Sequence, residues 1–178
     1  MLILCLCGCK SAEDAVDVAM ALRQNILSAN SCQFDAAVTA DYGDCIYRFK
    51  MSCITNKTGQ MQFEVIEPIS ISGITGSVDA QSSQLTFDGK ILAFSPLADG
   101  QITPVCAPWV FIHTLRSGYI NACGRNDHGY MLNINDSYRE DALELSIQLD
   151  AEGIPVLAQI YWQDRRVLSV EIENFMLS

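Results

Sequence analysis

The chain has 178 residues, of which 49% are hydrophobic and 18% are charged, and its formal net charge is −10 at pH 7. This length fits one domain that can bury a sizeable core. The acidic balance argues against nucleic acid as a partner, because phosphate binding needs a basic face, and against attachment to an anionic membrane by charge alone.

The first nine residues are apolar and end in Leu6-Cys7-Gly8-Cys9. This segment resembles the lipobox of bacterial lipoproteins, in which Cys9 is acylated and becomes the new N-terminus. No basic residue precedes Lys10, and the segment is shorter than a usual signal. We therefore interpret residues 1–9 as a truncated lipoprotein signal. The alternative is a buried N-terminal strand.

After Cys9, the apolar residues follow two types of periodicity. Apolar residues recur at helical spacing from Ser11 to about Ala29, which predicts an amphipathic helix directly after the anchor. From Cys32 to Ala40 the period changes to two, as is typical of a half-buried strand.

The next turn, residues 41–44, predicts a hairpin that carries several cysteines. If Ala40 pairs with Cys45 across the turn, the antiparallel register places Cys32 opposite Cys53. Both side chains would then point inward and lie close enough for a disulfide. The alternative is that the cysteines are small buried residues.

The rest of the chain predicts turn-linked strands around one further helix. That helix begins at Pro108, a favourable first helical residue, and ends near Ala122 with Gly124 as its cap. The predicted extended segments are residues 62–67, 69–74, 84–94 with an Asp88-Gly89 hairpin turn, 130–134, 143–150, 154–162 and 167–175.

This order of elements predicts an α+β fold. Successive turn-linked strands imply one large antiparallel sheet, and a sheet of this size curls. The N-terminal helix and the mid-chain helix are expected to cover its concave face. No linker interrupts the chain after the anchor, so residues 10–178 are predicted to form a single domain.

The layout resembles the LolA-like superfamily. The similarity lies in a strand that ends in Pro68, in Gly73-Ile74, in a strand with Asp88-Gly89-Lys90 and in the helix led by Pro108; the closing hairpins around residues 153–155 and 166–168 are also similar. The resemblance implies an unclosed β-barrel with helices at its mouth. Superfamily members include lipoprotein carriers, lipid-binding lipoproteins and germination lipoproteins that bind a cell-wall amidase.

An apolar concave face of this kind can leave a cavity that holds acyl chains. For each candidate lining residue the alternative is ordinary core packing. The candidates are Phe34, Val38, Tyr47, Phe49, Met51, Phe63, Phe87, Phe94, Trp109, Leu115, Leu145, Ile147, Ile160 and Trp162.

The sequence lacks the common catalytic motifs. It contains no GxSxG, HExxH or CxxC motif and no glycine-rich phosphate loop. We therefore expect no enzymatic activity, no metal site and no cofactor.

Two functions are expected from these observations. The first is an extracytoplasmic lipoprotein, attached to the membrane through lipidated Cys9, that binds acyl chains or the lipid moiety of another lipoprotein. The alternative is a protein-interaction lipoprotein that docks and regulates a cell-envelope enzyme such as a cell-wall amidase.

Overall fold

The structure is a computed structural model that describes residues 10–94, 97–98, 101–139 and 142–178. Its helices are α1 (Lys10–Ser28), the short 3-10 helix η1 (Pro104–Cys106) and α2 (Ala107–Ser117). Its strands are β1 (Ser31–Asp41), β2 (Ile46–Asn56), β3 (Met61–Glu67), β4 (Thr75–Val78), β5 (Ser83–Phe87), β6 (Lys90–Phe94), β7 (Leu97–Ala98), β8 (Gln101–Ile102), β9 (Tyr119–Asn126), β10 (Gly129–Asn135), β11 (Glu144–Leu149), β12 (Pro155–Trp162) and β13 (Arg165–Leu177).

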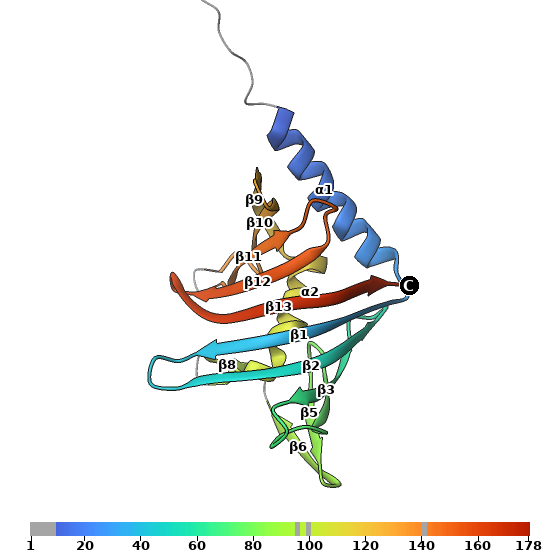
Figure 1. The fold of residues 1–178 in the computed structure, drawn as a ribbon, viewed down its shortest axis with the longest axis vertical. Helices are drawn as coiled ribbons and strands as arrows, with labels where there is room; N and C mark the ends of the chain where they lie inside the picture. Colours follow the sequence, from blue (N-terminus) through green and yellow to red (C-terminus); the bar gives the residue numbers. More distant parts are fainter. Residues whose placement is uncertain (1–9, 95–96, 99–100, 140–141) are drawn as a thin grey trace, which may run out of the picture.

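One antiparallel sheet of eleven strands dominates the fold, in the order β6-β5-β4-β3-β2-β1-β13-β12-β11-β10-β9 (Figure 1). The sheet is unclosed, with β6 and β9 at its two edges, while β7 and β8 form a separate two-stranded sheet. The predicted α+β architecture, with an N-terminal helix and a mid-chain helix, is therefore confirmed.

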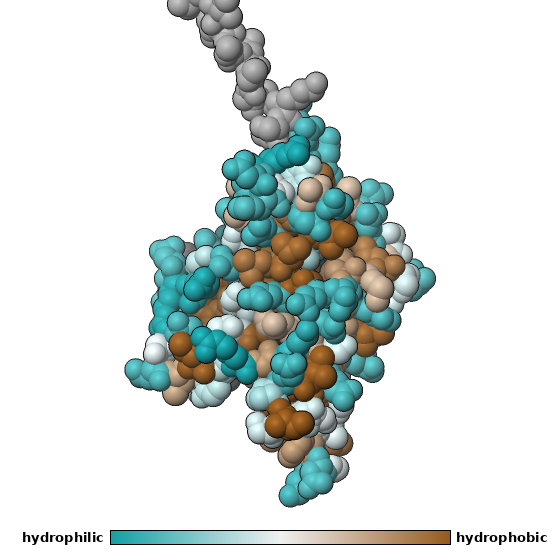
Figure 2. Space-filling view, viewed as in Figure 1, coloured by the Kyte–Doolittle hydropathy of each residue, from teal (hydrophilic) through white to brown (hydrophobic). Residues whose placement is uncertain are grey.

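Alternation along the strands separates the two faces of the sheet. In β1, Phe34, Ala36 and Val38 are buried beneath the helices, and residues between them are at least partly exposed. The face seen in Figure 2 mixes hydrophilic residues with hydrophobic ones, some of which gather in the upper half of the view. Alternation of this kind is what an antiparallel sheet with one buried face requires.

The two main helices cover one part of the concave face. Helix α1 contacts β9, β10 and α2, and helix α2 contacts β1, β10 and β13. The rings of Phe111 in α2 and Phe34 in β1 pack edge to face, with centroids 5.9 Å apart. From α1, Arg23 donates hydrogen bonds to the carbonyl oxygens of Leu115 (2.7 Å) and Gly118 (2.8 Å), so it holds the C-terminal end of α2.

The predicted mid-chain helix is too long. Helix α2 ends at Ser117, and residues 119–122 belong to β9, as does Gly124. The cap is Gly118, whose backbone is extended and whose N–H donates to the Thr114 carbonyl. A Cβ atom at this glycine would lie 2.7 Å from the Asn135 carbonyl oxygen, so close packing against β10 selects glycine here.

The predicted extended segment at residues 69–74 is also wrong, because turns occupy most of it and β4 begins only at Thr75. The Ile71 N–H donates to the Pro68 carbonyl, and the Gly73 N–H donates to the Val65 carbonyl. Gly73 has a φ of +84°, a conformation typical of a turn glycine. Local hydrogen bonds therefore form a turn here, although the alternating sequence pattern favoured a strand.

The register predicted for the β1–β2 hairpin differs from the structure by two residues. Ala40 pairs with Tyr47, so Cys32 lies opposite Thr55 and Cys53 lies opposite Phe34. The turn is centred on residues 42–45, because the Asp41 carboxylate accepts a hydrogen bond from the Gly43 N–H at 2.8 Å and the Tyr42 N–H donates to the Cys45 carbonyl.

Candidate functional site

An apolar cavity of about 580 Å³ lies on the concave face, beside the part that the helices cover. Strands β2, β3 and β5 form one wall, and the segment from Ile102 to Val105 faces them. The size falls within the range of roughly 300–1,000 Å³ that is usual for small-molecule sites. Its lining residues are Tyr42, Tyr47, Phe49, Val65, Ile71, Ile74, Leu85, Ile102, Thr103, Pro104 and Val105.

A hydrogen bond holds the two walls of this cavity together. The Tyr42 hydroxyl, just beyond β1, donates to the carbonyl oxygen of Ile102 in β8. Burial raises the pKa of Tyr42, and Tyr47 and Cys106 add to that effect. The ring of Tyr42 meets that of Tyr47 edge to face at 6.2 Å. Tyr47 is 52% exposed, which places it at the rim of the cavity.

The structure distributes the sequence-predicted lining residues over three environments. Tyr47 and Phe49 line the cavity. Phe87 is exposed, and Phe94 and Trp162 are half-buried outside the lining. The others lie buried in the core: Phe34, Val38, Met51, Phe63, Trp109, Leu115, Leu145, Ile147 and Ile160.

Most residues that line the cavity were not among the candidates predicted from the sequence. Val65 lies on the same strand face as the candidate Phe63, and Leu85 on the same face as the candidate Phe87. The alternation of inward and outward side chains would therefore have identified both residues. The lining residues in the turn at 71–74 and in the segment 102–105 follow no periodic pattern. Their position beside the cavity depends on the tertiary fold of the chain.

Cys32, Cys53 and Cys106 are buried, and the described cysteines are all free thiols. Burial raises the pKa of Cys32 to about 12, against a smaller opposing effect of Arg116. Burial likewise raises the pKa of Cys106 to about 12 and that of Cys53 further. Cys45 is exposed. A nucleophilic cysteine needs a lowered pKa, so the buried thiols are suited to packing.

We expect Cys45 to react with iodoacetamide at pH 8 at least about 100-fold faster than Cys32, Cys53 or Cys106, because a raised pKa leaves little thiolate and burial blocks access. Peptide mapping of the folded protein, with every cysteine up to position 9 replaced by serine, measures these rates. The denatured, unreduced protein should show five free thiols. A lower count would mean that a bridge forms after all.

The described part of the chain holds no cluster of three or more residues that suits a metal ion. Over the same residues, no helix is both long and apolar enough to span a membrane. The predicted lipidation residue Cys9 and the rest of residues 1–9 lie outside the described residues.

No protein-family model matches the sequence, and no curated protein matches it either. A solved structure described as an outer membrane lipoprotein-sorting protein domain, from Vibrio parahaemolyticus, is 9% identical with a TM-score of 0.50, over 94% of this chain and 93% of that one. A LolA superfamily protein from Nitrosomonas europaea is 10% identical with a TM-score of 0.48, over 94% of each chain. At such low identity, the likeness concerns the fold alone.

Proposed function

We propose that this chain, which has the LolA-like fold, binds acyl chains or the lipid moiety of a lipoprotein without catalysing a reaction. The observation that carries the proposal is the apolar cavity between β2, β3, β5 and residues 102–105. Acyl chains have no hydrogen-bonding groups, and each Å² of apolar surface moved out of water contributes roughly 25 cal/mol. A lining of aliphatic and aromatic side chains suits such a ligand.

The unequal cover of the concave face supports this proposal. Helix α2 fills the space above β1 and β13 with large side chains such as Phe111. Among the described residues, strands β2, β3 and β5 face the short segment 102–105 across the cavity. Because no described side chain of α1 or α2 lines that space, a ligand can enter it without displacing the core.

The test is native mass spectrometry of the protein purified from a membrane extract, with lipid extraction in parallel. Residues 10–178, proposed to be the lipid-binding domain, should carry a bound lipid in stoichiometric amount. A protein that is free of lipid, and that takes up none from vesicles, would contradict the proposal.

The proposed location is the outer side of a membrane, with lipid on Cys9 as the anchor. Helix α1 begins at the next residue, Lys10, and projects from one end of the molecule, away from the β5–β6 end (Figure 1). An anchor there would leave the sheet free of the membrane surface. Stable attachment takes more than one acyl chain, as a fully acylated cysteine provides.

Cys9→Ala is expected to move the protein from the membrane fraction to the soluble fraction. The loss of the acylated thiol removes the anchor, and a chain with net charge −10 has little affinity for anionic lipid. Fractionation and immunoblotting measure the effect, with Cys7→Ala as the matched control. Retention of the Cys9→Ala protein in the membrane would contradict the anchor.

A second candidate function is docking to an envelope protein, such as a cell-wall enzyme that the chain regulates. The observation that favours it is the β5–β6 hairpin at the sheet edge, where Phe87, Ile91 and Leu92 are 51%, 69% and 63% exposed. Exposed apolar residues on an edge strand are typical of interaction sites. A lipid-free protein whose partner binding is lost on Ile91→Asp would favour this alternative.

A further inference from the structure

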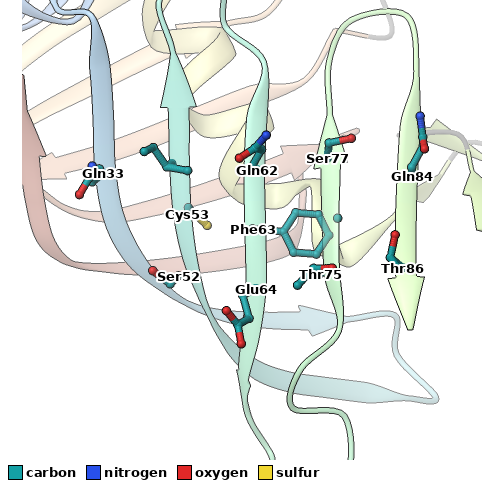
Figure 3. A pocket seen from close by; sticks show the side chains of 12 residues that line it. Gln33, Ser52, Cys53, Gln62, Phe63, Glu64, Thr75, Ser77, Gln84 and Thr86 are labelled. Carbon is teal, nitrogen blue, oxygen red and sulfur yellow. The ribbon is translucent and has the colours of Figure 1, made fainter. Parts of the chain in front are cut away.

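A second hollow, of about 620 Å³, lies across β1 to β5 (Figure 3). The side chains that Figure 3 labels come from all five strands and include amides, hydroxyls and one carboxylate. The lining residues are Gln33, Ser52, Cys53, Ile54, Gln62, Phe63, Glu64, Thr75, Gly76, Ser77, Gln84 and Thr86.

The polar lining residues occupy the strand face opposite the apolar cavity. In β3, Gln62 and Glu64 are exposed while Val65 is buried and lines the cavity. In β5, Gln84 and Thr86 line the hollow and Leu85 lines the cavity. Because successive side chains point to opposite faces of a strand, the same two strands serve both spaces. A ligand in one space does not occupy the other.

The polar side chains of the hollow have unused hydrogen-bonding capacity. It holds the carboxamides of three glutamines and the hydroxyls of two serines and two threonines. None of these side chains makes a hydrogen bond to another group in the described part of the chain. Carboxamides and hydroxyls both donate and accept, so the hollow can satisfy a ligand that does the same.

The charges identify the class of ligand. None of the described residues that line the hollow is a lysine or arginine, which disfavours phosphate or carboxylate ligands. Glu64, the one carboxylate among them, is by itself a poor cation site. Ile54, 39% exposed, offers one apolar contact within the polar surface. Lys50 of β2 does not line the hollow; it forms a salt bridge of 2.7 Å with Glu173 of β13.

We infer that this outer hollow binds a neutral saccharide chain. Such a chain presents hydroxyl groups that donate and accept hydrogen bonds along its edges, and C–H faces that suit an isolated apolar side chain. The hollow runs across five strands, which gives an elongated molecule contacts with several strands at once. This inference does not depend on the proposed binding of acyl chains, because the two spaces lie on opposite faces of the sheet.

The test is an NMR titration of the full folded chain with tetra-N-acetylchitotetraose, a neutral tetrasaccharide. We expect saturable shifts at millimolar concentration that are confined to β1–β5. Gln62→Ala and Gln84→Ala should each weaken binding about fivefold, the effect of losing one hydrogen bond. Gln148→Ala, at a glutamine on β11 outside the hollow, should leave binding unchanged.

Thr86→Val serves as a second variant that keeps the branched shape favoured in strands and removes only the hydroxyl. It should weaken binding without changing the thermal midpoint. A hyaluronan tetrasaccharide, which carries carboxylates, should bind more weakly than tetra-N-acetylchitotetraose. The absence of saturable shifts, equal binding of both sugars, or shifts that none of the three variants in the hollow reduces would overturn the inference.

Discussion

Leu85→Glu is expected to abolish lipid binding, lowering the affinity for acyl chains at least about 100-fold. Leu85 lines the apolar cavity from β5 and is half-buried. An acyl chain in the cavity would remove a glutamate at this position from water without supplying a hydrogen bond. Native mass spectrometry and displacement of a fluorescent fatty acid measure the loss.

The matched control is Ile66→Glu, which introduces the same charge at a 41% exposed position in β3 outside the cavity lining. It should bind lipid like the unmodified chain. Leu85→Trp fills the cavity without adding charge and should also block binding, which separates loss of space from repulsion. Lipid binding that survives both Leu85 variants, or that Ile66→Glu also destroys, would exclude this cavity as the site.

Phe111→Ala is expected to lower the free energy of unfolding by about 3–5 kcal/mol. The Phe111 side chain is fully buried and packs edge to face on Phe34, so its removal leaves a cavity between α2 and the sheet. Urea denaturation followed by circular dichroism measures the change. A shift of the midpoint without a change of slope would identify it as a loss of stability.

Phe87→Ala is the control for this prediction. Its ring is 51% exposed near the tip of the β5–β6 hairpin, so the same truncation should cost less than about 1 kcal/mol. An equal effect at both positions would mean that α2 does not pack on the sheet as the structure shows. Lipid binding should be retained in both variants under conditions in which they fold, because neither residue lines the cavity.

Elements with strong local signals were predicted correctly from the sequence. Helix α1 follows from apolar spacing at 3.6 residues, and its buried residues Ala15, Ala19, Leu22 and Ile26 keep that spacing. The hairpin of β5 and β6 follows from Asp88-Gly89, both with positive φ, as a two-residue turn requires. In these cases the residues that define the element are neighbours in sequence.

Three predictions differed from the structure: the end of α2, the β1–β2 register and the extended segment at residues 69–74. The end of α2 is set by the close approach of Gly118 to β10, and the β1–β2 register is set by the turn at residues 42–45. The sequence pattern favoured a longer helix and a shorter hairpin because it contains no record of those contacts. For the same reason it missed Ile102, Pro104 and Val105 as cavity residues.

By itself, the sequence determined the alternation of inward and outward side chains along strands such as β1 and β3, and the order of most helices and strands, because these properties depend on local periodicity. It thereby determined an apolar concave face and a polar outer face. Only the tertiary structure decided that the concave face is filled at β1 and β13 and hollow at β2, β3 and β5. An apolar residue looks the same in sequence whether another side chain or a cavity lies opposite it. Whether the space is filled depends on the positions of α2 and residues 102–105 in the folded chain.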